Sequence, residues 1–104
     1  MHTIFKYPVK ISGMSWHLQT IDLPVGAEPL SFHLQNGQPC LWAMVDPDAP
    51  TAPRIFLVAG TGGPICQDPL SLLFVGSVLM HDDALVWHLF EVFPENEKLV
   101  GGTE

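Results

Sequence analysis

The chain has 104 residues, of which 47% are apolar and 14% charged, so it has enough apolar sequence for one buried core and is not intrinsically disordered. Its formal net charge is −7 with only four Lys and Arg residues, which excludes nonspecific binding to a nucleic acid backbone. No apolar run approaches the length of a membrane span and the N-terminus lacks signal-peptide features, so we expect a soluble intracellular protein.

Seven segments have the length and the β-branched and aromatic content that are typical of strands. Closely spaced breakers separate them, since the chain contains 9 Gly and 10 Pro residues. Pro8 lies near the end of the first segment or on an exposed edge, where proline is tolerated. The last segment is also long enough for a helix, which is the alternative for it. The expected strands cover residues 3–11, 16–23, 31–35, 38–43, 54–59, 72–80 and 84–93.

The dipeptide Asn36-Gly37 predicts a two-residue hairpin between the third and fourth segments, because both central residues of a type I′ turn adopt positive φ. Side chains alternate along a strand, so this turn also determines which residues share a face. The expected cross-strand pairs are Gln35–Gln38, His33–Cys40, Phe32–Leu41 and Ser31–Trp42. Phe32, Leu34, Leu41 and Ala43 then form one face, and His33, Gln35, Cys40 and Trp42 form the other.

The segments between the expected strands are rich in turn residues. Residues 45–53 are Pro-rich and predict a loop, and residues 60–64 predict a flexible, glycine-rich turn. Residues 66–71 predict a turn or one helical turn, and residues 81–83 predict the turn between the last two strands. The polar residues 94–104 predict a C-terminal tail.

These elements describe an all-β protein, either a small antiparallel β-sandwich or an open barrel of about six to seven short strands. A single β domain is expected over residues 1–93. Residues 85–92 are apolar on both faces, so a neighbouring layer must cover each face. We expect another subunit to cover one of them, with Trp87 as an anchor, which predicts a homo-oligomer and most simply a dimer. In the alternative, the N-terminal strands cover that face and the protein is a monomer.

Candidates for catalysis and metal binding are few. Cys40 opposite His33 is the one nucleophile and base that the strand register brings together, and a thiol beside an imidazole on a sheet is usually a packing contact. We therefore predict no enzymatic activity and no cofactor. His81 and His88, with the acids between them, lack the spacing of a metal site, so no bound metal is expected. Cys40 and Cys66 are expected to be free thiols.

Two groups of residues are candidates for binding a ligand or a partner. One group shares the mixed face of the hairpin, where the indole of Trp42 is expected to be partly exposed. The other is the turn at residues 60–62, whose backbone N–H groups suit an anion, together with Arg54, which begins the strand that leads to this turn. The candidate residues are His33, Gln35, Trp42, Arg54, Gly60, Thr61 and Gly62.

Four stretches form a recognisable pattern, namely IFKYPVKI, LPVGAEPLSFHLQNGQPCLWAMVDPD, GTGGPI and ALVWHLFEV. The motifs within them fall on Lys6–Pro8, Gln35–Ala43, Gly60–Gly62 and Trp87–Glu91. With these motifs the chain resembles, over residues 1–93, a family of small uncharacterised bacteriophage and prophage proteins. The Cys-Leu-Trp-Ala block is the most specific part of the resemblance. That family often has His at the position of Gly63, so any role of such a His is absent here.

The resemblance implies a phage or prophage origin and action in the host bacterial cytoplasm, and it supplies no activity. We predict a non-catalytic accessory protein that binds a host protein, for instance as an inhibitor of a host or antiviral-defence factor, with no nucleic acid or membrane partner. One alternative is a binder of a nucleotide-like ligand at a subunit interface, through Trp42, Arg54 and the amides of residues 60–62. Another is a small virion structural component. The acidic charge favours binding of a host protein over binding of a nucleotide, because a phosphate-rich ligand usually requires more than one arginine per chain.

Overall fold

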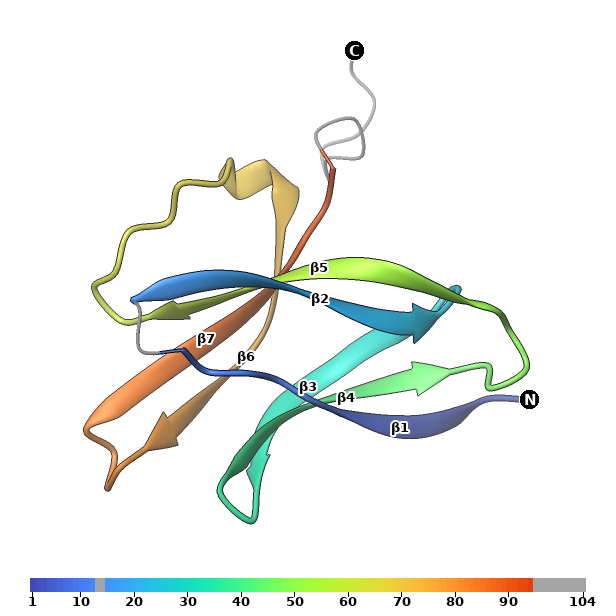
Figure 1. Cartoon of the computed structure of the whole chain (residues 1–104), viewed down its shortest axis with the longest axis horizontal. Helices are drawn as coiled ribbons and strands as arrows, with labels where there is room; N and C mark the ends of the chain where they lie inside the picture. Colours follow the sequence, from blue (N-terminus) through green and yellow to red (C-terminus); the bar gives the residue numbers. More distant parts are fainter. Residues whose placement is uncertain (13–14, 95–104) are drawn as a thin grey trace.

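The computed structural model describes residues 1–12 and 15–94, and these form seven strands in two antiparallel sheets (Figure 1). The strands are β1 (Thr3–Pro8), β2 (Trp16–Pro24), β3 (Glu28–Gln35), β4 (Gln38–Val45), β5 (Thr51–Gly60), β6 (Leu72–Met80) and β7 (Leu85–Val92). The three-stranded sheet has the order β1-β4-β3, and the four-stranded sheet has the order β2-β5-β7-β6. The predicted all-β fold class, a small antiparallel sandwich, is confirmed.

The hairpin of β3 and β4 forms around the predicted turn. Asn36 has a φ of 52° and Gly37 a φ of 78°, as a type I′ turn requires. All four expected cross-strand pairs are present, from Gln35–Gln38 at the turn to Ser31–Trp42. The prediction of the turn and of its register is therefore confirmed.

The main core lies between the two sheets and contains side chains that alternate along the strands. On the three-stranded sheet it includes Phe32 on β3 and Leu41 on β4. On the four-stranded sheet it includes Phe56 on β5 and Leu89 on β7. All four are at most 1% exposed, so this layer is closed to water at its centre and supplies most of the apolar burial that stabilises the fold.

β6 and β3 approach each other closely at Gly76. A Cβ atom at this position would lie 3.1 Å from the Cβ of Phe32 and 3.2 Å from its backbone nitrogen, which is tighter than ordinary contact. The pairing of β6 with β7 shifts register between Phe74 and Gly76, which indicates a bulge there. Glycine thus lets the four-stranded sheet pack directly against the backbone of the three-stranded sheet.

The two faces of β7 are both apolar, as predicted, and the structure shows which of them is covered. Leu89 points into the main core and Trp87 packs against it, so their side of β7 faces the three-stranded sheet. Phe90 alternates with them and points to the outer side, where its ring meets that of Phe74 edge to face at 5.5 Å. Trp87 thus lies on the side that faces the core, where its indole is half-buried, and its role as a subunit anchor stays a prediction.

Several element boundaries differ from the sequence prediction. The loop predicted at 45–53 is too long, because β5 begins at Thr51 and includes Pro53. β7 pairs with β5 only from Ile55 onward, so Pro53 has a strand neighbour on one side alone, and a sheet edge tolerates proline. β1 ends at Pro8, short of residue 11, and the helical alternative for the last segment is wrong because β7 is a strand.

The segment between β5 and β6 contains the expected single helical turn, η1 (Pro69–Ser71). The side chain of Asp68 accepts a hydrogen bond from the backbone nitrogen of Leu70 at 2.9 Å, which caps this turn. Within the described ranges, no helix is long and apolar enough to cross a membrane. The tail predicted at 94–104 lies, apart from Pro94, outside the described residues.

Candidate functional site

The outer face of the three-stranded sheet, on the side away from the core, gathers three of the predicted binding residues. Trp42 on β4 lies between Ser31 on β3 and Lys6 on β1. His33 and Gln35 alternate with the buried Phe32 and therefore share this outer side. We call this surface the Trp42 face, and its residues are Ile4, Lys6, Glu28, His33, Gln35, Trp42 and Met44.

Lys6 connects the aromatic and polar parts of the Trp42 face. Its ammonium nitrogen lies 5.9 Å from the centroid of the Trp42 ring, within the range of a cation–π contact. The same nitrogen donates a hydrogen bond to the side-chain oxygen of Gln35. Ile4 and Met44 face each other beside this group and are 56% and 36% exposed. The surface therefore combines an anchored indole with uncovered apolar side chains and a polar margin.

Sequence reasoning found part of the Trp42 face and missed the rest. His33, Gln35 and Trp42 follow from the hairpin register alone. Lys6 and Ile4 join them only because β1 pairs with β4, and no local signal in β1 specifies that partner. A hairpin turn determines its own two strands, whereas pairing between distant strands depends on the whole core.

Cys40 and His33, the one nucleophile and base pair weighed from the sequence, face each other as expected. The thiol of Cys40 is 2% exposed and donates to the backbone carbonyl of Gln38 at 3.4 Å. This contact directs the thiol hydrogen to the neighbouring backbone rather than toward solvent.

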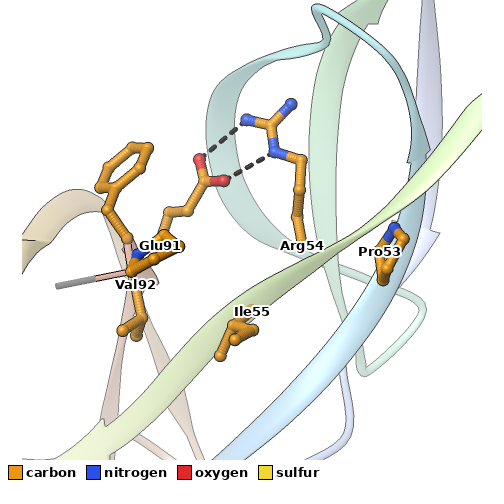
Figure 2. A pocket seen from close by; sticks show the side chains of 7 residues that line it. Pro53, Arg54, Ile55, Glu91 and Val92 are labelled. Carbon is orange, nitrogen blue, oxygen red and sulfur yellow. Dashed lines mark hydrogen bonds and ion pairs between the residues drawn. The ribbon is translucent and has the colours of Figure 1, made fainter. Parts of the chain in front are cut away.

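Arg54 lies on β5 and is engaged by groups of its own chain (Figure 2). Its Nε donates to Oε2 of Glu91 at 2.6 Å, and one terminal nitrogen donates to Oε1 at 2.8 Å. The other terminal nitrogen donates to the carbonyl of Ala27 at 2.7 Å. Glu91 is 3% exposed, so its carboxylate is buried and compensated by this arginine. An open pocket of about 350 Å³ lies beside the pair, lined also by Pro53, Ile55, Val92, Phe93 and Pro94.

The glycine-rich turn after β5 uses its backbone amides internally. Gly60 donates to the carbonyl of Ser15 at 2.8 Å, Thr61 to that of Val86 at 3.2 Å, and Gly63 to that of Gly60 at 3.0 Å. A ligand anion requires N–H groups that point freely into a concavity. Three amides in this turn are thus already satisfied by the protein itself.

The side chain of Thr61 belongs to a group that the sequence did not reveal. Its hydroxyl lies 2.8 Å from Nε2 of His88, and the hydroxyl of Ser77 lies 2.6 Å from Nδ1 of the same ring. Ser77 and His88 are cross-strand neighbours on β6 and β7. Each ring nitrogen thus has a hydroxyl partner, and which hydroxyl donates depends on the tautomer of the ring. The ring thereby ties the turn after β5 to the four-stranded sheet.

The predicted residues thus fall into three separate places within one chain. Trp42 belongs to the three-stranded sheet, and Arg54 and Gly60 belong to the four-stranded sheet. Arg54 and Gly60 are six positions apart on β5, which corresponds to about 20 Å along an extended strand. A single chain therefore does not bring Trp42, Arg54 and the glycine turn together around one ligand.

The residues weighed as metal ligands at the β6–β7 turn have the conformation of turn residues. His81, Asp82 and Asp83 all have positive φ, between 54° and 67°. The described part of the chain contains no group of three or more His, Cys, Asp or Glu residues that is placed to hold a metal ion. Both cysteines are free thiols, with Cys40 buried and Cys66 exposed.

Comparison with known proteins gives one match. Residues 1–99 match the model of a family described as a domain of unknown function (DUF7352). Neither the search of curated proteins nor the search of solved structures found a match.

Proposed function

This chain belongs to the DUF7352 family, and we propose that it is a non-catalytic accessory protein, of phage or prophage origin, that binds a host protein through the Trp42 face. The observation that carries the proposal is the position of Trp42, half-buried under Lys6 and flanked by the exposed Met44. Trp and Met are enriched at the centres of protein interfaces, where a polar margin surrounds them. The Trp42 face has this composition.

The charge of the chain indicates the chemistry of the partner. With a formal net charge of −7, the protein repels other acidic proteins and attracts a basic one at long range. We propose a host protein with a basic surface around an apolar patch that accepts the indole. Association is then expected to slow as the salt concentration rises, because screening weakens this attraction.

The alternative of a nucleotide-like ligand has less support from the contacts. Its phosphates need cationic groups and free amides, and Arg54 is already paired with the buried Glu91. Releasing Arg54 would leave that carboxylate buried without its partner, which is strongly unfavourable. Binding of a host protein to the Trp42 face leaves the pair of Arg54 and Glu91 intact.

The test combines capture with a measured affinity. Proteins of a bacterial host lysate that bind the tagged chain are identified and purified, and their dissociation constants are measured by calorimetry with wild type and with Trp42→Ala. Loss of a central indole at an interface weakens binding by about 30-fold or more. The matched control is Leu70→Ala, which removes an apolar side chain that is 47% exposed on η1, away from the Trp42 face. A partner that binds Trp42→Ala as tightly as wild type contradicts the proposal.

A further inference from the structure

The outer face of the four-stranded sheet is a second uncovered surface, on the opposite side of the molecule from the Trp42 face. Leu57 on β5 and Phe90 on β7 are cross-strand neighbours here, and Leu57 is fully buried without belonging to the main core. Around them lie four apolar side chains that remain in contact with water. These are Leu18 (44% exposed), Ile55 (40%), Phe74 (56%) and Leu79 (48%).

This surface, which we call the neutral face, lacks charged side chains over most of its extent. Among the described residues of β5, β6 and β7, the positions that point outward contain no Asp, Glu, Lys or Arg. Asp22, opposite Pro53 near the end of β2, is a carboxylate on this side. The polar pair Ser77 and His88 lies on this face between Phe74 and Leu79, so its apolar surface has two parts. Exposed apolar surface on soluble monomers is usually scattered or small, so this face is a candidate interface.

We propose that the neutral face binds the neutral face of a second copy of this chain, which forms a two-fold symmetric dimer. Two copies that each carry a formal charge of −7 repel each other unless they meet where neither has charge. The neutral face allows such a contact, because its described outward positions on β5, β6 and β7 carry no Asp, Glu, Lys or Arg. A basic host protein would instead be attracted to acidic surface, which this face does not offer. A two-fold axis makes the same patch complementary to itself.

The size of the neutral face fits a modest dimer interface. Four strands, each about eight residues long as in β7, cover roughly 500 Å² of flat area at ordinary strand spacing and rise. Phe74 and Leu79 contribute exposed apolar area, whereas Leu57 and Ala59 are buried and contribute almost none. Specific interfaces bury about 600 to 1,000 Å² on each partner, so the flat area of this face lies just below that range, as in weak and transient complexes. We therefore expect a reversible dimer that forms in the micromolar range.

This dimer is independent of the proposed host binding and has a consequence for it. The Trp42 faces of the two copies point away from the central interface, because each lies on the far side of its own core. A dimer therefore presents two binding faces and binds a multivalent target with increased apparent affinity.

Sedimentation velocity on the full chain over a wide concentration range tests the proposal. The expected result is a concentration-dependent rise from the 11.4 kDa of one chain to twice that mass. Leu79→Asp places a charge within the interface and is expected to raise the dimer dissociation constant by about 100-fold or more. Ile4→Asp adds the same charge to the Trp42 face and is the matched control, with an expected change of less than about threefold.

A variant that fails to fold would be recognised by circular dichroism. The proposed interface is then tested on the wild-type protein alone. In a mixture of isotopically labelled and unlabelled chains, the Leu79 methyl groups are expected to show contacts between copies in nuclear magnetic resonance spectra. A mass of one chain at every concentration overturns the proposal, and so does a dimer without these contacts. Trp42→Ala is expected to dimerise normally, so loss of host binding and loss of dimerisation are distinguishable.

Discussion

Arg54 and Glu91 form a two-point ion pair that joins β5 to β7, with nitrogen to oxygen distances of 2.6 and 2.8 Å. The side chain of Glu91 is 4% exposed and that of Arg54 is 23% exposed, so the pair is largely shielded from water. The guanidinium also donates a hydrogen bond to the carbonyl of Ala27, which lies just before β3. One side chain thus connects three segments of the fold.

We predict that removal of either partner of this pair destabilises the protein strongly. Arg54→Ala leaves a buried carboxylate without a counter-charge, which is expected to lower the free energy of unfolding by about 3–5 kcal/mol. The measurement is a urea titration followed by circular dichroism. The double variant Arg54→Met with Glu91→Leu removes both charges and is expected to lose much less. Equal losses in the single and double variants would show that packing, not the uncompensated charge, dominates.

A second prediction concerns the turn at Asn36 and Gly37. Gly37 has a φ of 78° and no atom within 4 Å of where a Cβ would lie, so Gly37→Ala introduces backbone strain without a clash. We expect a loss of about 1–2 kcal/mol in the free energy of unfolding. Asn36→Gly, at a φ of 52°, is the control and is expected to change stability by less. An unchanged urea midpoint for Gly37→Ala would contradict a type I′ turn.

A third prediction concerns stability at alkaline pH. Tyr7 packs against the core, and its burial raises the pKa of the phenol above the usual value of 10.0. As the pH rises through the ordinary tyrosine pKa, the unfolded chain loses this proton before the folded protein does. The folded state is then disfavoured, so stability falls with rising pH until the phenol of the folded protein also ionises.

The variant Tyr7→Phe isolates this effect from the titration of lysines. Urea titrations between about pH 9 and 11 are expected to show a steeper loss of stability in wild type than in Tyr7→Phe. Parallel pH profiles for the two proteins would indicate that the phenol is not buried in the folded state.

A fourth prediction distinguishes the two thiols. Cys66 is exposed and Cys40 is 2% exposed, so a thiol reagent is expected to modify one cysteine rapidly in the folded protein and both in denaturant. Cys66→Ser is expected to abolish the rapid reaction and leave the slow one. The finding of no reactive thiol in the wild type, even in denaturant, would reveal a disulfide and contradict the expectation of free cysteines.

The comparison of prediction and structure separates two kinds of residue in the candidate sites. His33, Gln35 and Trp42 could be grouped in advance because one turn of known geometry sets their register. Arg54 could not be interpreted in advance, since its partner Glu91 lies on β7, far along the chain. The same holds for Thr61, whose hydrogen bond to His88 depends on how the turn after β5 meets the sheet.

Sequence patterns alone were enough to predict the all-β class, the hairpin at Asn36 and the two apolar faces of the last strand. These features are local, because φ preferences and the alternation of side chains act over a few residues. Three features became visible only in the folded chain: Trp87 faces the core, Phe74 lies on the outer side, and Lys6 contacts Trp42. Such choices depend on which distant strands pair, and that pairing is settled by the summed packing of the whole core, which no short stretch of sequence contains.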